Sequence, residues 1–392
     1  MSISQINNIQ HNSTEMTTPS ISIFPNELIH ECTKHINKVI DIYNLSFTNK
    51  HFYQLIYNNN FPTWTTLLKS HFPSSFQLNP RHLKPMDLYQ NLKITDNNMR
   101  TGNYQTRTLT GHEEWVNCVA VSDGILISGS DDTTIKIWDL KTEKTLRSLA
   151  SHQSGVTCLA LKGKMLISGS LDHTIKIWDL ETGKEIRSLI GHQSFIECLI
   201  VKDDLLISGS DDHTIKIWNL ETGKEIHTLS GHQDSIHCLT IKDGMLISGS
   251  VDKTIKIWDL KSGKEIRSLT AHNNTINSLV IKDGMLISGS ADRKIKIWDL
   301  DSGKELRRLT GHVKGVVRLL VKDGMLISSS VDKTIKIWDI DSGKVLHSLT
   351  GHQDMILSIA LNDGMIISGS ADKTIKIWNF SSFLTPLCGN PN

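Results

Sequence analysis

A period of 40 residues constrains this chain more than any other feature of its sequence. Residues 125–140 read ILISGSDDTTIKIWDL, and nearly the same stretch returns six more times at this period, with no insertion or deletion. Each copy is a short apolar run, a polar turn and a run that alternates Ile with Lys before a Trp. This pattern predicts two antiparallel strands joined by a hairpin.

Two further short runs in each repeat supply the remaining strands. In the first copy they are residues 116–121 and 145–149, each bounded by Gly, Asp, Lys or Ser turn residues. A sheet of four strands cannot bury both faces alone, so consecutive sheets must pack face to face. The repeats therefore predict an all-β ring of seven four-stranded sheets, a seven-bladed β-propeller.

The two ends of the repeat region fit one another. Residues 106–110 (TRTLT) look like the fourth strand of a unit whose first three strands are missing. The seventh unit stops after its third strand, at residues 378–380. We expect the first strand to complete the last sheet, because closure removes exposed strand edges.

Paired residues at fixed places in each unit carry a family resemblance. Gly111-His112 stands ahead of Trp138-Asp139, and similar pairs recur at the same spacing in the other units. In this the chain resembles the WD-repeat (WD40) family of β-propellers, over residues 104–380. The departures are Ser151 and Ala271 in place of the Gly, and Asn219 and Asn379 in place of the final Asp.

Every unit also supplies a His, a Ser, an Asp and a Trp. Such a set could indicate nucleophilic catalysis, but an active site needs one special environment and this set occurs seven times. The resemblance implies instead a hydrogen-bonded tetrad that holds each blade together, and whether Ser128 or Ser130 is its serine stays open. The predicted tetrads are His112, Ser128, Asp132, Trp138; His152, Ser168, Asp172, Trp178; His192, Ser208, Asp212, Trp218; His232, Ser248, Asp252, Trp258; His272, Ser288, Asp292, Trp298; His312, Ser328, Asp332, Trp338; and His352, Ser368, Asp372, Trp378.

Charge and cysteine usage narrow the function further. The 42 basic and 41 acidic residues give no global field toward nucleic acid or a membrane surface, which favours a protein partner. Four of the six cysteines occupy one repeat position, which Ser or Arg fills elsewhere, so we interpret them as small buried residues. They are Cys118, Cys158, Cys198 and Cys238, with Cys32 and Cys388 outside the series. We expect no metal site, no cofactor and no enzymatic activity.

The region before the repeats divides into three parts. Residues 1–20 are polar and predict a disordered leader, residues 21–71 have helical apolar spacing, and residues 72–103 predict a helical linker. The middle part resembles an F-box, which in its family docks on a Skp-type adaptor of cullin-RING ubiquitin ligases; the alternative is a helical cap that packs on itself. The residues that carry the adaptor-binding resemblance are Phe24, Pro25, Leu28, Leu45, Phe52, Leu55 and Trp64. Residues 381–392 predict a loose tail.

Specificity in a repeat scaffold lies where the units differ. The most variable places are the residue before the first strand (Trp115 in unit 1), the second residue of that strand (Asn117) and the residue before the turn aspartate (Asp131). The resemblance places all three on the top rim of the central channel. The predicted target-binding residues are Trp115, Asn117, Asp131, Leu171, Phe195, Glu197, Asp211, His237, Met355 and Leu357.

These positions predict an apolar arc edged by Glu197, Asp131 and Asp211, with Val317 and Leu357 as candidates for inward-facing core instead. None of the three sets contains an arginine, which argues against recognition of a phosphorylated target by the rim. Weaker basic signals remain at Arg318 and at the turn residues Lys253, Arg293, Lys333 and Lys373.

Together these features predict an F-box/WD-repeat protein that recruits substrates to an SCF-type cullin-RING ubiquitin ligase. Its partners would be a Skp-type adaptor and a short segment of an unknown target protein, with no nucleic acid and no membrane. The alternative is a WD40 interaction scaffold with no ligase. We expect a cytoplasmic protein, with the nucleus as an alternative, or a host's cytosol if the chain is a microbial effector.

Overall fold

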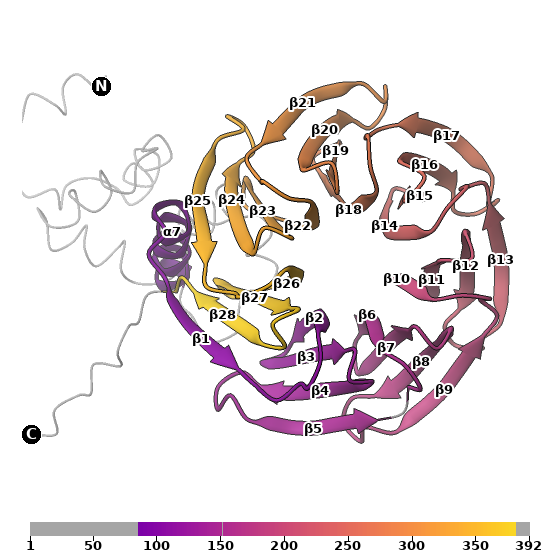
Figure 1. The fold of residues 1–392 in the computed structure, drawn as a ribbon, viewed down its shortest axis with the longest axis horizontal. Coiled ribbons are helices and arrows are strands. Elements are labelled where there is room, and N and C mark those ends of the chain that lie inside the picture. Colours follow the sequence, from indigo (N-terminus) through magenta and orange to yellow (C-terminus); the bar gives the residue numbers. More distant parts are fainter. Residues whose placement is uncertain (1–84, 151, 382–392) are drawn as a thin grey trace, which may run out of the picture. The chain divides into compact units, whose positions relative to one another are not determined.

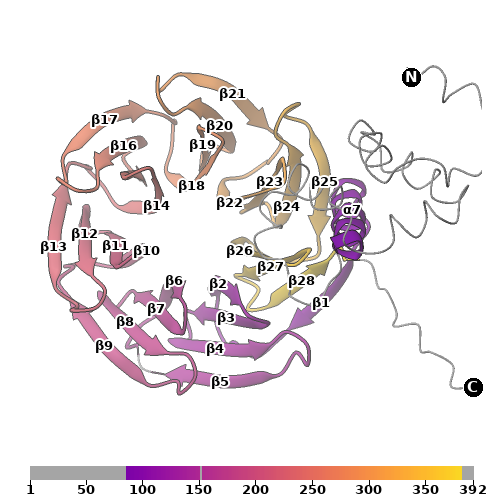
Figure 2. The ribbon, with the colours of Figure 1, turned by 180° about the vertical axis from the view of Figure 1, so that it is seen from behind.

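The computed structural model describes residues 85–150 and 152–381. Seven four-stranded antiparallel sheets form a closed ring around a central axis (Figures 1 and 2), which confirms the predicted seven-bladed propeller. The innermost strand of each sheet packs against the innermost strands of both neighbours, all the way round. The bounds of the three inner strands follow the 40-residue period, except that β28 begins one residue later than its counterparts.

Blades 1 to 6 each take four consecutive strands, numbered from the axis outward. Blade 1 contains β2 (Val116–Ser122), β3 (Ile125–Ser130), β4 (Thr134–Asp139) and β5 (Thr145–Ala150); blade 2 contains β6 (Val156–Lys162), β7 (Met165–Ser170), β8 (Thr174–Asp179) and β9 (Glu185–Ile190); blade 3 contains β10 (Ile196–Lys202), β11 (Leu205–Ser210), β12 (Thr214–Asn219) and β13 (Glu225–Ser230). Blade 4 contains β14 (Ile236–Lys242), β15 (Met245–Ser250), β16 (Thr254–Asp259) and β17 (Glu265–Thr270); blade 5 contains β18 (Ile276–Lys282), β19 (Met285–Ser290), β20 (Lys294–Asp299) and β21 (Glu305–Thr310); blade 6 contains β22 (Val316–Lys322), β23 (Met325–Ser330), β24 (Thr334–Asp339) and β25 (Val345–Thr350).

Blade 7 is built from both ends of the repeat region. It contains β26 (Ile356–Asn362), β27 (Met365–Ser370) and β28 (Ile375–Asn379), and its outermost strand is β1 (Gln105–Leu109). The two end strands pair antiparallel from Gln105 opposite Asn379 to Leu109 opposite Ile375. This arrangement confirms that the first strand completes the last sheet.

Tight turns keep the inner strands in register. Between β14 and β15 the two turn residues Asp243 and Gly244 both have positive φ, 49° and 77°, which is the two-residue hairpin whose twist matches the strands. In each blade the ladder between the first two strands skips the residue after the start of the inner strand, a β-bulge at Asn117 and its six counterparts. A bulge changes the direction in which side chains point, so the side chain at this position, called the bulge slot below, does not follow the regular alternation of the strand.

The hydrophobic core lies between blades. In blade 1, Ile127, Ile135 and Ile137 pack against Leu166 and Trp178 of blade 2. Leu126 and Trp138 pack against blade 7, and the other blades repeat this arrangement. Cys118, Cys158, Cys198 and Cys238 are buried free thiols, which confirms their interpretation as small core residues. Cys32 and Cys388 lie outside the described residues.

Helix α7 (Pro85–Thr101) precedes the ring, and from Asn91 onward it belongs to the same compact unit as the propeller. It ends where Gly102 takes a φ of 74° and the Asn103 amide donates to the Asn98 carbonyl at 3.0 Å, a helix C-cap. No helix in the described part of the chain combines the length and apolar character needed to cross a membrane.

Candidate functional site

The repeated His, Ser, Asp and Trp come together as a chain of hydrogen bonds in every blade. In blade 1 the Trp138 indole N–H donates to Ser128 Oγ at 2.8 Å, and Ser128 Oγ lies 2.7 Å from His112 Nε2. His112 Nδ1 lies 2.7 Å from Asp132 Oδ2. Because the carboxylate only accepts, Nδ1 carries the ring proton and Nε2 accepts the serine hydroxyl.

The other six blades repeat this geometry closely. The Trp–Ser distances are 2.8–2.9 Å, the His–Ser distances 2.7–2.8 Å and the His–Asp distances 2.7–3.0 Å. The neighbouring Ser130 has another role: its Oγ donates to the Glu114 carbonyl at 3.2 Å and accepts from the Asp132 amide at 3.1 Å. The structure therefore identifies Ser128 and its counterparts, not Ser130, as the tetrad serines.

The charge state of the tetrad follows from burial and hydrogen bonding. Burial by itself raises the pKa of Asp132, but donors from Thr134, His112 and the Glu113 amide outweigh burial and lower this pKa to about 2. Burial lowers the pKa of His112 more than the facing Asp132 raises it. The pair is therefore a neutral imidazole and a carboxylate at neutral pH, and identical sets in seven blades hold the scaffold rather than perform chemistry.

The predicted target-binding positions meet in pairs on one face. The Asp131 amide donates to the Trp115 carbonyl at 2.9 Å, and the Asp211 amide donates to the Phe195 carbonyl at 3.0 Å, so two of the variable slots lie side by side in each unit. Trp115 is 41% exposed and Phe195 39%, both large for aromatic side chains in a folded protein. The centres of the Phe195 and His173 rings lie 5.6 Å apart, with the ring planes tilted by 57°.

Three further predicted target-binding positions carry apolar side chains. Leu171, Met355 and Leu357 are all half-buried. Leu357 and Val317 belong to none of the hydrophobic clusters found among the described residues, which argues against the alternative that they are core. Both occupy the bulge slot of the innermost strand.

Asn117 has a second role that the sequence did not indicate. Its Nδ2 donates to Asp131 Oδ1 at 2.6 Å and to the Val156 carbonyl of blade 2 at 3.1 Å. In the same slot Thr157 and Asn277 donate to carbonyls of the next blade. These three side chains brace adjacent inner strands, so an Asn117 substitution would disturb the scaffold as well as any bound target.

The acidic edge of the face is weaker than the sequence indicates. Burial, with repulsion from Asp211 added, raises the pKa of Glu197 to about 7. Glu197 is therefore only partly ionised at neutral pH instead of carrying a full negative charge. Asp211 accepts a hydrogen bond from Ser235 Oγ, and Asp131 accepts the bond from Asn117. Burial also lowers the pKa of His237, the blade 4 residue in the bulge slot.

Arg318 is the charged residue that sequence reasoning undervalued. Its Nη1 donates to the Asn277 carbonyl at 3.1 Å, and its charge opposes the raised pKa of Glu197 and of the buried Cys158. The guanidinium of blade 6 is thus bonded to blade 5, and its charge also acts on groups of blades 2 and 3. The available signal was that Arg318 alone is charged among the seven residues of the cysteine slot.

The outer basic arc of turn residues is partly neutralised. Lys373 Nζ lies 3.0 Å from Glu114 Oε1, and Lys333 Nζ donates to the Gln353 carbonyl at 2.6 Å. The side chains of Lys253 and Arg293 make no hydrogen bond or ion pair with any described residue. The predicted adaptor-binding residues Phe24, Pro25, Leu28, Leu45, Phe52, Leu55 and Trp64 all lie outside the described residues.

We expect Glu197→Gln to stabilise the propeller increasingly as pH rises. The folded-state pKa lies above the value near 4.3 of an unfolded chain, so the stability linked to this group is fully present below about pH 4.3 and is lost as pH rises through about 7. The gain over wild type should approach about 1–3 kcal/mol at pH 8 and vanish at pH 4. Calorimetric unfolding at both pH values measures it; a gain that shrinks with rising pH would contradict the assignment.

Comparison with known proteins identifies the family. The family described as "WD domain, G-beta repeat" (WD40) matches residues 103–139, 143–179, 183–219, 223–259, 263–299, 303–339 and 343–379. The chain belongs to this family. Among solved structures, the WD40 β-propeller domain of Doa1 is similar with a TM-score of 0.65 and 30% identity, covering 71% of this chain and 97% of that one. The computationally designed Ika8 protein is similar with a TM-score of 0.60 and 34% identity, covering 69% and 98%.

Curated relatives match over short stretches. The chain is 46% identical over 50 residues to the probable E3 ubiquitin ligase complex SCF subunit scon-2 of Neurospora crassa, covering 13% of this chain and 8% of that protein. It is 39% identical over 61 residues to the probable E3 ubiquitin ligase complex SCF subunit sconB of Talaromyces marneffei, covering 16% and 9%. The match thus spans less than a tenth of either relative. Both printed names are those of subunits of a ubiquitin ligase complex.

Proposed function

We propose that the protein recruits substrates to an SCF-type ubiquitin ligase. Residues 21–71 would bind a Skp-type adaptor, and the face carrying Trp115 and Phe195 would bind the target. The observation that carries the proposal is the similarity of this WD40 chain to relatives named as SCF subunits. The resemblance of residues 21–71 to an F-box, read from the sequence, agrees with it. The protein would act in the cytoplasm or the nucleus.

The chemistry of the face favours an unphosphorylated target segment with apolar anchors. Exposed aromatic side chains beside half-buried aliphatic ones are the usual composition of protein-binding hot spots. The Asp131 and Asp211 carboxylates near the rim would repel a phosphate group, which carries about −1.5 to −2 charges. Arg318 bonds to a backbone carbonyl on the inner strand and makes no ion pair with either carboxylate.

A crossed capture experiment tests both halves of the proposal. Wild type, the double variant Leu28→Ala with Leu45→Ala, and Trp115→Ala are expressed in a eukaryotic cell and captured, and the bound proteins are quantified by mass spectrometry. The double variant should lose adaptor and cullin and keep targets, since two buried apolar contacts contribute roughly 1.5–3 kcal/mol each. Trp115→Ala should keep adaptor and cullin and lose targets at least tenfold.

The outcomes separate the ligase from a plain scaffold. Capture of adaptor and cullin by wild type, lost in the double variant, supports the ligase proposal. Capture of targets without any adaptor would favour an interaction scaffold with no ligase. Targets that require phosphorylation and tolerate Trp115→Ala would show that a different part of the propeller binds them.

A further inference from the structure

The seven blades offer an internal comparison along the outermost strands. The second residue of this strand is a large aliphatic side chain in blades 1 to 6. In blades 1 to 5 it is 45–58% exposed, at Leu146, Ile186, Ile226, Ile266 and Leu306. In blade 6 its counterpart Leu346 is half-buried and packs against a hydrophobic cluster. Something covers this position in blade 6 alone among these blades.

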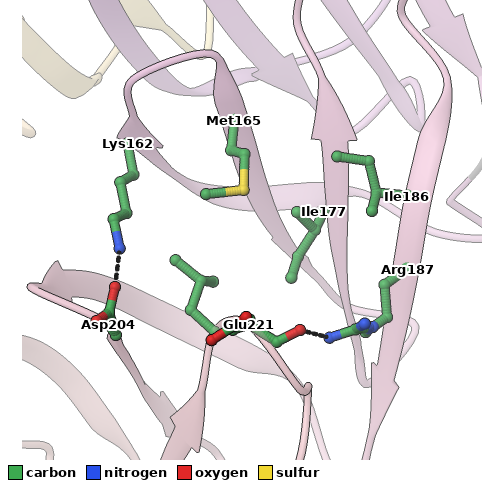
Figure 3. A pocket seen from close by; sticks show the side chains of 8 residues that line it. Lys162, Met165, Ile177, Ile186, Arg187, Asp204 and Glu221 are labelled. Carbon is green, nitrogen blue, oxygen red and sulfur yellow. Dashed lines mark hydrogen bonds and ion pairs between the residues drawn. The ribbon is translucent and has the colours of Figure 1, made fainter.

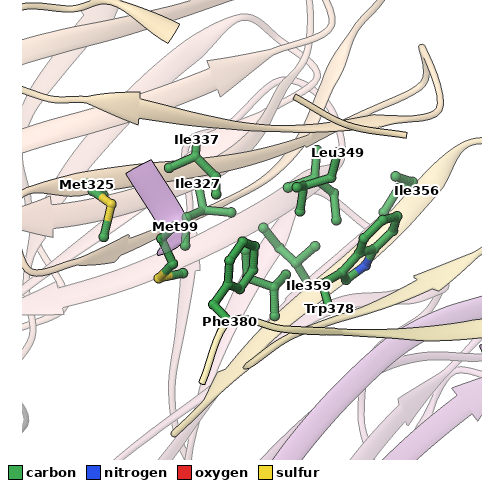
Figure 4. Packing of buried hydrophobic residues seen from close by; sticks show 11 residues of the cluster. Met99, Met325, Ile327, Ile337, Leu349, Ile356, Ile359, Trp378 and Phe380 are labelled. Atoms are coloured by element: carbon green, nitrogen blue, oxygen red, sulfur yellow. The ribbon is translucent and has the colours of Figure 1, made fainter. Parts of the chain in front are cut away.

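The cover is the last turn of α7. Met99 is fully buried and packs between Met325 and Phe380, with Ile337 and Leu346 in the same cluster (Figure 4). Met325 is completely buried, whereas the residue in the same slot of every other blade stays partly exposed. Blades 6 and 7 therefore form a socket for a methionine side chain.

Two polar contacts flank this methionine. The side-chain amide of Asn98 donates from Nδ2 to the Phe380 carbonyl at 2.7 Å, and Arg100 Nη1 donates to Asp339 Oδ2 at 3.4 Å. In the sequence Asn-Met-Arg, the Asn side chain thus donates to a backbone carbonyl, the Met side chain fills an apolar hollow and the Arg side chain pairs with a carboxylate. These three features define what the socket recognises.

The same socket recurs, unfilled by α7, between blades 2 and 3. A hollow of about 340 Å³ there is lined by Met165, Ile177, Ile186 and Leu220 (Figure 3). Each of these lies four repeats before a residue of the Met99 cluster, namely Met325, Ile337, Leu346 and Phe380. The hollow is framed by two bridges between the blades, Lys162 Nζ to Asp204 Oδ1 at 2.7 Å and Arg187 Nη1 to the Glu221 carbonyl at 2.7 Å.

The polar acceptors of this second socket are also in place. The Leu220 carbonyl, counterpart of the Phe380 carbonyl, accepts no hydrogen bond from any described residue. Between blades 1 and 2 and between blades 5 and 6, Arg147 and Arg307 donate to the equivalent carbonyls of Leu180 and Ile340. Asp179, counterpart of Asp339, is held ionised because hydrogen bonds from Thr182 lower its pKa.

We propose that the groove between blades 2 and 3 is a second protein-binding site that accepts a helix of a partner presenting methionine preceded by an amide side chain and followed by arginine. The methionine would fill the hollow over Met165, the amide would donate to the Leu220 carbonyl, and the arginine would pair with Asp179. The site is separate from the face that carries Trp115 and does not depend on a ligase function.

The test uses the full chain and a fluorescent peptide of residues 91–104 (NLKITDNNMRTGNY), which carries the Asn-Met-Arg sequence. The chain's own helix fills the socket of blades 6 and 7, so the added peptide should bind between blades 2 and 3. Fluorescence anisotropy should show saturable binding that falls at least tenfold in Ile186→Asp and when the peptide methionine is replaced by Asp.

Leu306→Asp is the matched control. Leu306 holds the same position in its strand as Ile186 and is nearly as exposed, 56% against 54%. Beside Leu306, however, Arg307 already donates to the Ile340 carbonyl, the counterpart of the Leu220 carbonyl. Binding that survives Leu306→Asp and is lost in Ile186→Asp, with both variants melting like wild type, supports the proposal. No binding, equal loss in both variants, or no loss in Ile186→Asp overturns it. A concentration-dependent dimer that Ile186→Asp abolishes also overturns it, since the occupant would be a second copy.

Discussion

A chain that begins at Gly111 should melt at least about 10 °C below one that begins at Asn91, and should aggregate. The truncation removes β1, so β28 becomes an edge with unpaired N–H and C=O groups. It also removes buried Leu109, whose loss alone costs about 2–5 kcal/mol, and the hydrogen bond from Lys376 Nζ to Thr108 Oγ1 at 2.8 Å. A total of at least about 5 kcal/mol corresponds to this shift for a domain of this size.

The truncation also removes α7, so a second variant isolates the strand. Leu109→Asp in the full chain leaves the helix in place and places a charge against Ile375 and Ile377 in the core. It should destabilise the propeller nearly as much as the truncation does. If the Gly111 chain melts with the Asn91 chain in scanning calorimetry, ring closure through β1 contributes little.

The fold was predictable because one unit explains its neighbours. Strand order, hairpins and closure all follow from a strict period, since a blade can bury its faces only against copies of itself. The choice between Ser128 and Ser130 was not predictable. Both are buried serines on the same strand, and only the three-dimensional position of the Trp138 indole distinguishes them.

The sequence located variable positions that are exposed in the structure, but it did not predict the chemistry of the charged groups among them. Variability located Trp115 and Phe195, which are exposed, but it treated Glu197 as a plain rim charge. The pKa of Glu197 depends on its burial and on repulsion from Asp211. Both depend on the three-dimensional arrangement of the blades and cannot be read from the sequence. The socket for Met99 could not be predicted for the same reason. Met99 and the blade 6 and 7 residues that contact it are far apart in the sequence and come together only in the fold.

Blade 6 departs from the repeat at two facing positions. In blades 1 to 4 a cysteine pairs with a glycine across the first two strands, and a Cβ on that glycine would lie 2.7 Å from the cysteine Sγ. In blade 6 the pair is Arg318 and Ser329. Ser329 Oγ is the one buried side-chain polar atom without a partner among the described residues.

Two adjacent serines should therefore respond in opposite ways to the same substitution. Ser328→Ala leaves the Trp338 indole N–H and His312 Nε2 without the hydroxyl that lies 2.8 Å and 2.7 Å from them. Each unpaired buried group costs about 1–3 kcal/mol, so we expect a loss of about 2–5 kcal/mol. Ser329→Ala removes an unsatisfied buried hydroxyl and should leave stability unchanged or raise it by about 1 kcal/mol.

Calorimetric unfolding of the two variants side by side measures this contrast, with each serving as the control for the other. Both substitutions remove one oxygen from the same strand, β23, at fully buried positions, so the difference reports hydrogen bonding and not lost volume. The tetrad is the cause if Ser328→Ala is the worse variant by at least about 2 kcal/mol. Equal losses at both positions would mean that tight packing of β23, and not the tetrad, sets the stability of this blade.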